Sequence, residues 1–364
     1  MIRRFGTSGL LLLIVLVAAN AALCKEAPIE KQIIEIALKG PLSNPLSEVS
    51  GLAWYNDYLI VLPQYPGRIE SKYDGKLFAI PKKEILSYLK KIEKNKEVPP
   101  IEPREIDFIS HDIYKSIDSF EGFEALEFWG NRVFIIIEAS PAQMVCYLVK
   151  GEITPDLSRI TLEKSGKPVK IQAQASISNA SYETILVTED KVTAIFEGNG
   201  RNVNVSPLAY VYDHELNFIY AIAFPNIEYR ITDATRVENG KFWCINYFWP
   251  GETGKYKPAE DPLAKEYGQG KTHAQSKIVE RLVEFEYIDM EPEKYKSGDS
   301  VKTEYSKIVL TGTPPVQLQL LASGKGNARN WEGIVRLDKR GFLIVSDEHP
   351  RTILGFVKSG NARH

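Results

Sequence analysis

The chain has 364 residues, with 45 Lys and Arg against 47 Asp and Glu, which gives a formal net charge of −2. This balance gives no electrostatic reason to expect binding to nucleic acid or to an anionic membrane surface. The length is sufficient for a large hydrophobic core, arranged as one domain or two.

The first 21 residues have the composition of a secretory signal peptide. A basic start at Arg3-Arg4 precedes an apolar run from Leu10 to Ala19, and Ala19-Asn20-Ala21 is a small-x-small cleavage site. The apolar run is too short to span a bilayer comfortably. We therefore expect a secreted or periplasmic protein with a linker at 22–31 and no membrane attachment after cleavage. A lipid anchor on Cys24 is disfavoured because Leu23 stands where a small residue is required.

Five segments of the remaining chain share one pattern. Each begins with a hydroxyl or acidic residue, continues as a short alternating apolar strand, turns tightly and continues as a second strand, which is typical of a β-hairpin. The segments are SGLAWYNDYLIVLPQ from Ser50, EALEFWGNRVFIIIE from Glu124, ETILVTEDKVTAIFE from Glu183, DATRVENGKFWCINY from Asp233 and EGIVRLDKRGFLIVSDE from Glu332.

The repeated hairpins predict an all-β fold, a five-bladed β-propeller over residues 32–358 with a short tail at 359–364. A third strand follows every hairpin and an outer strand follows four of them. The last repeat lacks its outer strand, and the strand Gln32–Leu38 precedes the first repeat, so the N-terminal strand is expected to close the ring. A two-sheet sandwich is less consistent with five polar residues at equivalent strand starts.

Three segments between the hairpins leave alternatives open. The 99 residues from Asp233 to Glu332 could hold a sixth blade, although they contain no sixth hairpin of this pattern. Within them, Gly251–Lys277 is rich in Gly, Pro and Lys, which predicts a long surface loop that could act as a lid. The charged stretch Lys82–Glu102 predicts one amphipathic helical turn followed by a linker.

Cys146 and Cys244 both lie within strand patterns. Buried free thiols are the simplest interpretation. A disulfide between them stays open in an oxidising compartment, and no zinc-ligand spacing is present.

If the first strand of each blade lines the axis, one serine and four carboxylates point towards a common centre. Two carboxylates about 5 Å apart repel each other by about 3 kcal/mol at an effective dielectric constant near 20, so protons or a cation must compensate them. A ligand set made only of oxygen atoms suits calcium. The alternative is that these side chains cap strands by accepting backbone N–H groups. The predicted calcium ligands are Ser50, Glu124, Glu183, Asp233 and Glu332.

The loops after the second strands lie at the same end of the propeller as these ligands. Three of them carry an arginine at an equivalent offset, Arg68, Arg201 and Arg351. Three guanidinium groups around a metal suit a small anionic ligand, although each could instead form a surface ion pair. Tyr65 and Trp249 are candidates for stacking on the ligand.

The same loops supply candidates for proton transfer beside a calcium-activated water. His349 could equally be bonded to its loop neighbours. The catalytic candidates are Glu138, Glu197, Glu348 and His349.

The order of the five axial residues resembles the calcium site of the calcium-activated nucleotidases, the secreted five-bladed apyrases. In that family Ser, Glu, Glu, Ser and Glu open the innermost strands, and Asp233 here departs from the pattern. EGFEAL and NWEGIVRLDKRGFLIVSDE also look like the "esterase-like activity of phytase" and related periplasmic propellers. The resemblance covers about a quarter of the chain and omits the nucleotidases' substrate-contacting segments. It therefore bears on the fold and the metal more than on the activity.

Two functions follow as hypotheses. The first is a calcium-dependent hydrolase of phosphate esters or anhydrides, with the three arginines holding the anion. The second is a non-catalytic propeller that binds a ligand or a protein and uses calcium only to hold its blades together, because the fold alone does not decide activity.

Overall fold

The computed structural model describes residues 27–44, 47–69, 74–164, 167–289, 295–297, 300–302, 306–321, 328–347, 349 and 351–359. The expected signal peptide at 1–21, Cys24, Glu348 and residues 360–364 lie outside these ranges. Within them, no helix is both long enough and apolar enough to cross a membrane.

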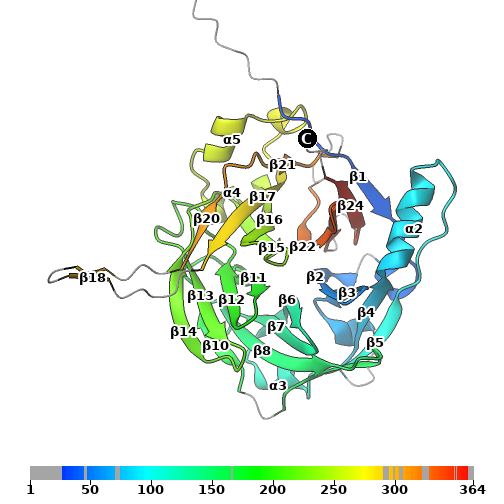
Figure 1. The fold of residues 1–364 in the computed structure, drawn as a ribbon, viewed down its shortest axis with the longest axis horizontal. Coiled ribbons are helices and arrows are strands. Elements are labelled where there is room, and N and C mark those ends of the chain that lie inside the picture. The colour runs from blue at the N-terminus through cyan, green and yellow to red at the C-terminus, as the bar shows by residue number, and fades with distance from the viewer. Residues whose placement is uncertain are drawn as a thin grey trace, which may run out of the picture.

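The strands form blades that radiate from a central axis (Figure 1). In the described part of the chain, five innermost strands contact their neighbours in a closed cycle around this axis. These strands are β2 (Val49–Tyr55), β6 (Phe120–Trp129), β11 (Tyr182–Val187), β15 (Arg230–Ala234) and β22 (Trp331–Leu337). The prediction of an all-β propeller is confirmed.

Each innermost strand pairs antiparallel with the second strand of its hairpin, as the five sequence segments predicted. The turns between them contain Asn56, Gly130, Asn239 and Asp338 with positive φ angles, the backbone conformation that tight hairpins require. The second strands are β3 (Tyr58–Pro63), β7 (Arg132–Ala139), β12 (Lys191–Phe196), β16 (Lys241–Phe248) and β23 (Gly341–Ser346).

A third strand pairs with each second strand, and the outer strands complete the blades. The third strands are β4 (Lys76–Pro81), β8 (Val145–Ile153), β13 (Leu208–Asp213), β17 (Val279–Ile288) and β24 (Leu354–Lys358). The outer strands along the chain are β5 (Arg104–Ile109), β9 (Arg159–Leu162), β10 (Val169–Gln172), β14 (Phe218–Ala223), β20 (Lys307–Leu310) and β21 (Val316–Gln317).

The N-terminal strand β1 (Ile33–Ile36) pairs antiparallel with β24, with Ile33 opposite Val357 and Ile36 opposite Leu354. It therefore supplies the outer strand that the last blade lacks, and the ring closes as predicted. Strands from the two ends of the chain thus form one four-stranded blade.

One connection was not predicted. Strand β9 pairs in parallel with β5, with Asp107 opposite Arg159, and also pairs with β8. The first two blades are thereby joined into one nine-stranded sheet. A parallel pair formed over about 50 intervening residues has no local sequence signal.

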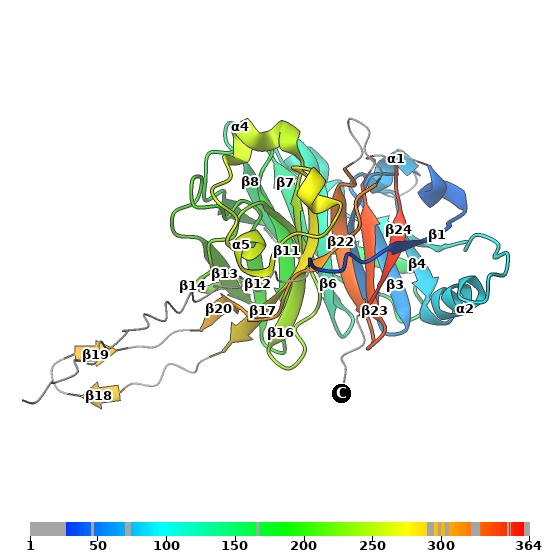
Figure 2. The same cartoon turned by 90° about the horizontal axis from the view of Figure 1, so that it is seen from above.

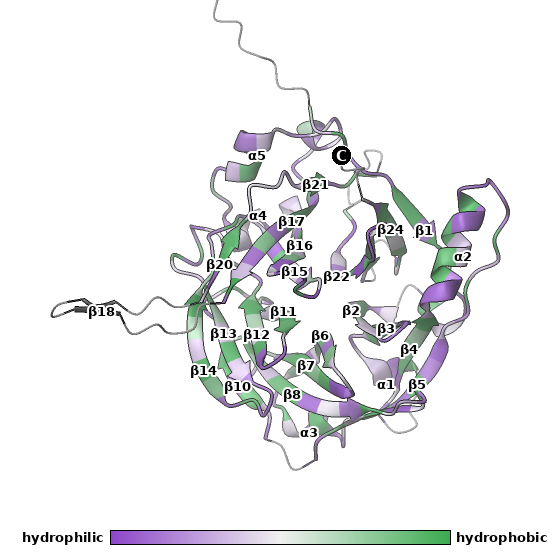
Figure 3. Ribbon diagram, in the orientation of Figure 1, coloured by the Kyte–Doolittle hydropathy of each residue, from purple (hydrophilic) through white to green (hydrophobic). Residues whose placement is uncertain are grey.

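The hydrophobic core lies between the faces of neighbouring blades, and hydrophobic residues recur along the blade strands in Figure 3. Trp331 is fully buried, and the Trp54 indole donates a hydrogen bond to the Arg336 carbonyl of the adjacent blade at 2.8 Å. Both pack between blades, whereas Trp129 is 43% exposed at the end of its strand. Cys146 and Cys244 are buried free thiols.

The helices lie outside the blades or in the loops (Figures 1 and 2). Where one helical turn was predicted, α2 (Lys82–Ile92) continues for eleven residues because Ile85, Tyr88 and Leu89 bury one face against β4 and β1. The remaining helices are η1 (Gly40–Ser43), α1 (Pro66–Ile69), α3 (Ile113–Ser116), η3 (Pro250–Glu252), α4 (Thr253–Tyr256), α5 (Pro262–Tyr267) and η4 (His273–Gln275).

The insertion Gly251–Lys277 is folded against the blades rather than extended as a surface loop. It contains η4 and two short helices, α4 and α5, and buries Tyr256, Leu263 and His273. Further along the same connection, β18 (Tyr295–Ser297) and β19 (Ser300–Lys302) form a separate hairpin that lies away from the ring in Figure 2.

Candidate functional site

Four of the five predicted axial residues occupy β-bulges, three of them at the second residue of the strand and Glu124 at the fifth residue of β6. The strand register shifts by one residue at Ser50, Glu124, Glu183 and Glu332, so that each stands between two paired neighbours without a partner of its own. A bulge bends the strand and redirects the side chain that it carries. The repeated sequence column is therefore a repeated bulge that turns one oxygen-bearing side chain towards the axis in each blade.

A small residue follows each axial residue. A Cβ atom built on Gly333 would lie 3.0 Å from the Leu52 backbone nitrogen, and one on Gly51 would lie 3.1 Å from a Leu126 methyl carbon. The innermost strands approach each other too closely at this level for a large side chain. The residues concerned are Gly51, Ala125, Thr184, Ala234 and Gly333.

The side chains on the four bulges, Ser50, Glu124, Glu183 and Glu332, line a cavity of about 540 Å³ at the end of the propeller where the innermost strands begin. We call it the axial cavity. The described residues that line it are Ser50, Gln64, Glu124, Glu138, Asn179, Glu183, Arg230, Tyr247, Trp249, Glu252, Ala328, Asn330, Glu332, Asp347 and His349.

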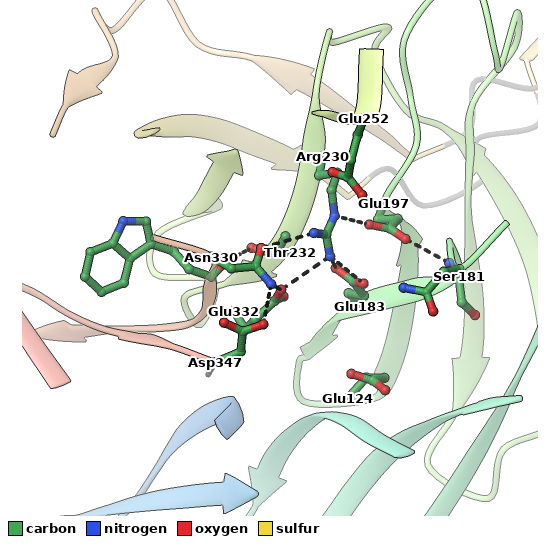
Figure 4. A network of polar contacts seen from close by, with 12 residues as sticks. Glu124, Ser181, Glu183, Glu197, Arg230, Thr232, Glu252, Asn330, Glu332 and Asp347 are labelled. Atoms are coloured by element: carbon green, nitrogen blue, oxygen red, sulfur yellow. Dashed lines mark hydrogen bonds and ion pairs between the residues drawn. The ribbon is translucent and has the colours of Figure 1, made fainter. Parts of the chain in front are cut away.

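Arg230, at the start of β15, places its guanidinium among the carboxylates (Figure 4). Its Nε donates to Glu197 Oε2 at 2.5 Å, and one terminal nitrogen donates to both Glu183 oxygens at 2.9 and 3.0 Å. The same nitrogen lies 3.4 Å from Glu332 Oε1, and the other donates to Asn330 Oδ1 at 3.1 Å. One buried cation from the chain itself thus holds three carboxylates from the two blades on either side of its own.

On the opposite side of the cavity, the described lining residues include no second Lys or Arg. Glu124 Oε1 accepts a hydrogen bond from Gln64 Nε2 at 3.0 Å, and Figure 4 shows this carboxylate apart from the Arg230 contacts. Glu138, only 4% exposed at the end of β7, has an Oε1 atom with no hydrogen-bond partner among the described residues. An unpartnered buried carboxylate oxygen is costly, because nothing replaces the water that it loses.

Burial controls the protonation of these groups. It raises the pKa of Glu138 to about 8, with a further contribution from the negative charge of Glu197. Burial likewise raises the pKa of Glu332 to about 8, opposed by Arg230. The pKa values of Glu124, Glu183 and Asp347 are raised for the same reason. Raised carboxyl pKa values clustered in a cavity are typical of functional sites.

Asp233, the fifth predicted ligand, is placed differently. Its Oδ2 accepts the backbone N–H of Ile334 at 2.8 Å, and the residue does not line the axial cavity. In β15 the register shifts across both Thr232 and Asp233, so this bulge differs from the other four. Asp233 thus makes the backbone hydrogen bond that the alternative interpretation expected.

The predicted rim residues separate into two groups. Glu138, Trp249 and His349 line the axial cavity, and the buried Glu197 reaches it through Arg230. Arg68 pairs with Glu48 at 2.6 Å and stacks on Tyr65, and both line a different pocket of about 360 Å³.

The other two arginines also lie away from the cavity. Arg351 pairs with Glu35 of the N-terminal strand at 2.5 Å, and both side chains are about half exposed. Arg201 is exposed and does not line the axial cavity. The structure therefore does not bring the three arginines together around the calcium candidates.

The first residues of the Gly251–Lys277 insertion form part of the rim. Lys255 Nζ donates to the Asn179 carbonyl at 2.9 Å and pairs with Glu252 at 3.1 Å. Further on, Lys257 accepts from Asn202 Nδ2 at 2.8 Å through its carbonyl, and the Ala259 N–H donates to Glu228 at 2.9 Å. These bonds hold this part of the insertion in place beside the cavity.

Arg230 is the functional residue that the sequence did not reveal. It lies three positions before Asp233, in a strand whose bulge is shifted. The available signal was an arginine directly at the start of an innermost strand, next to a column of acidic residues, but its partners are 33, 47 and 102 residues away in the chain.

The donor set fits calcium only in part. Ser50, Glu124 and Glu138 offer oxygen atoms without a competing guanidinium, whereas Arg230 engages Glu183 and Glu332 and Asp233 lies elsewhere. In the described ranges, no three His, Cys, Asp or Glu side chains are already arranged as metal ligands. Calcium at this position stays a prediction.

No family model matches the sequence, and no curated protein matches it. Solved structures that are similar to the chain include a glucose dehydrogenase, with 10% identity, 90% of this chain and 99% of that chain covered and a TM-score of 0.43. Another is a GH43 β-xylosidase/α-arabinofuranosidase from a compost microbial metagenome, with 10% identity, 91% and 96% covered and a TM-score of 0.43.

The soluble aldose sugar dehydrogenase of Escherichia coli is a third, with 9% identity, 90% and 99% covered and a TM-score of 0.40. Similarity at this level carries nothing about activity, and the resemblance to the nucleotidases and the phytase-like propellers stays a prediction.

Proposed function

We propose that this protein is a calcium-dependent hydrolase that acts outside the cytoplasm, with the axial cavity as its active site. The observation that carries the proposal is the unpartnered Oε1 of the buried Glu138, which lines the same cavity as Glu124 and Ser50. A buried carboxylate needs a cation or a proton, and this group of ligands contains only oxygen atoms, which calcium prefers.

Ser50, Glu124 and Glu138 would hold the ion, and the Gln64 amide, which already bonds Glu124, would keep that carboxylate in place. Bound calcium would supply Lewis acidity, by orienting and polarising an oxygen of the substrate. Its position at the wall of an open cavity favours a site that a substrate can reach over a closed structural site.

The remaining groups of the cavity would position the substrate and exchange protons. Arg230 fixes Glu183 and Glu332, and Asn330 Nδ2 donates to Glu332 and, at 2.7 Å, to Asp347. Asp347 and His349 lie on the loop after β23 and face the cavity, where they could take or give a proton. Because Asp347 also bonds the His349 backbone N–H at 2.7 Å, these two residues are held as one unit.

The extracytoplasmic location is supported by the predicted signal peptide at residues 1–21, which lies outside the described part of the chain. Expression of the full chain in a bacterial host tests this directly. Recovery from the periplasm or the medium of a product that begins near Ala22 is expected, and an unprocessed product in the cytoplasm would contradict it.

The hydrolase is tested by incubating the chain from Ala22 with nucleotides, phosphomonoesters, p-nitrophenyl esters and p-nitrophenyl glycosides, in calcium or in chelator. Calcium-dependent release from one substrate class is expected, and Glu138→Gln should abolish it. The matched control is Glu127→Gln, a buried carboxylate in β6 that bonds Arg236 rather than the axial cavity.

The outcomes of this assay separate the two hypotheses. No turnover by a folded protein that calcium still stabilises would leave the non-catalytic binding propeller, in which Arg230 and calcium hold the blades together. No thermal stabilisation by calcium would remove the metal from the proposal altogether.

A further inference from the structure

The axial cavity is strongly biased in charge. Six carboxylates line it, from Glu124, Glu138, Glu183, Glu252, Glu332 and Asp347. Arg230 is the only Lys or Arg among the described lining residues, and its donors are already directed at Glu183, Glu197 and Asn330. A guanidinium that already donates to several buried acceptors has little left for a ligand.

This bias acts against an anionic ligand. The arginines expected to hold an anion lie elsewhere, with Arg68 and Arg351 paired to Glu48 and Glu35. Even a bound divalent cation would leave the lining carboxylates in excess. A phosphate or carboxylate entering the cavity would meet mainly negative or protonated carboxyl groups, and like charges in a poorly solvated site repel strongly.

The polar groups that remain suit hydroxyl groups. The Asn179 side chain offers an amide, and the carboxyl groups accept O–H donors whether or not they are ionised. Both N–H groups of Asn330 already donate to Glu332 and Asp347, so this side chain offers only the second lone pair of Oδ1, beside the bond from Arg230. A cavity of about 540 Å³ has the size of sites that hold small organic ligands.

Trp249 adds an apolar surface at this cavity. The residue follows β16, lines the cavity and is 45% exposed, which is unusual for so large an aromatic side chain. Its ring folds back over Gly251, where an added Cβ atom would lie 2.2 Å from two ring carbons. The glycine therefore gives the indole room for this position.

We propose that the axial cavity binds a neutral saccharide, with a sugar ring packed on Trp249 and its hydroxyls bonded to Asn179, Asn330 and the lining carboxyl groups. The inference rests on the proposed function, because calcium and Arg230 would occupy the cation positions of the cavity while the remaining carboxyl groups repel anions, which leaves neutral, hydroxyl-rich ligands as the best match. The indole supplies the flat apolar face that the C–H groups of a sugar ring can cover.

The test is calorimetric titration of the calcium-loaded chain with neutral trisaccharides of glucose, xylose and mannose, and in parallel with ATP and spermidine. At least one trisaccharide is expected to bind, and ATP and spermidine are not. Trp249→Ala should weaken saccharide binding by about tenfold or more, as removal of a central aromatic contact does. Trp249→Phe should keep part of the affinity that Trp249→Ala loses.

The matched control is Trp129→Ala. Trp129 is 43% exposed, almost as much as Trp249, but it lines a different cavity at the other end of the axis. An unchanged affinity in this variant is expected. Gly251→Ala provides a second test that leaves the indole present but displaces its ring, and it should also weaken binding.

The inference is overturned if no trisaccharide binds, if ATP or spermidine binds in their place, or if the two tryptophan variants lose affinity equally. A thermal shift with calcium, recorded on the same samples, reports on the proposed function independently. Saccharide binding without a calcium shift would retain the ligand class and reject the metal. A calcium shift without saccharide binding would retain the metal and reject the ligand class.

Discussion

The two ends of the propeller axis each contain a partly or fully buried arginine from the β15 region, but in different electrostatic surroundings. At the turn end, Arg236 pairs with one carboxylate, Glu127, at 2.6 Å and directs further N–H groups to the carbonyls of Trp54 and Phe128. At the cavity end, Arg230 pairs with Glu183, Glu197 and Glu332, and its positive charge also acts on the pKa of Glu138, which it lowers against the effect of burial.

The difference distinguishes a structural ion pair from a functional cluster. At the turn end, the positive charge of Arg236 is balanced by the negative charge of Glu127, and carbonyl oxygens accept its further N–H groups. Several buried carboxylates against one guanidinium leave a deficit of positive charge that folding alone does not remove. A cluster of this kind is retained at a cost in stability, and such costs are typical of sites that bind something.

The largest expected effect is the loss of Arg230. Arg230→Met should lower the free energy of unfolding by roughly 3–5 kcal/mol, because three buried carboxylates lose their counterion. Urea denaturation at pH 7 in excess chelator measures it. Arg230→Lys keeps the charge but not the forked geometry and should lose less. A methionine variant as stable as the wild type would show that Arg230 does not balance the cluster.

Arg236→Met should lower the free energy of unfolding by less, about 1–2 kcal/mol, because a single carboxylate is affected and the Arg236 side chain is 40% exposed. The same urea experiment gives the value, and the thermal shift caused by calcium should be unchanged. A loss as large as that of Arg230→Met, or a lost calcium response, would mean that the two ends are not separate sites.

Replacing Glu138 should raise the stability of the metal-free protein rather than lower it. Glu138→Gln removes a buried carboxylate whose Oε1 has no partner in the described part of the chain, so the metal-free protein should gain up to about 1 kcal/mol. The calcium-induced rise in Tm should disappear. Glu127→Gln, which breaks the Arg236 pair, should lower Tm and leave the calcium response intact. Equal behaviour of the two variants would refute the distinction between the ends.

The propeller could be predicted from sequence because its evidence is local and repeated. Alternating strands, tight turns and an oxygen-bearing residue before each small residue recur at Ser50, Glu124, Glu183 and Glu332. Each of these repeats is one hairpin with a bulge at its oxygen-bearing residue, so the pattern in the chain corresponds directly to geometry at the axis. The closing strand could be inferred because the blade that needed it lacked its outer strand.

The charge balance could not be predicted in the same way. Arg230 meets Glu197 and Glu332 across blade boundaries, and Arg351 meets Glu35 over 316 residues. The shared offset of the three arginines reflected the repeated hairpins, but loop conformation and distant partners decided where each guanidinium lies. Short patterns predict which face a side chain occupies, and they do not predict which opposite charge is nearest.

The smallest expected effect concerns Asp233, which shares the sequence column but not the cavity. Asp233→Asn should change stability by about 0.5–1 kcal/mol, because the amide oxygen can still accept the Ile334 N–H. The calcium-induced rise in Tm should be the same as in the wild type, as measured by thermal denaturation with and without calcium. If Asp233→Asn instead removed the calcium response as fully as Glu138→Gln, the ion would lie deeper on the axis than the axial cavity. The comparison between the two ends would then have to include a metal between them.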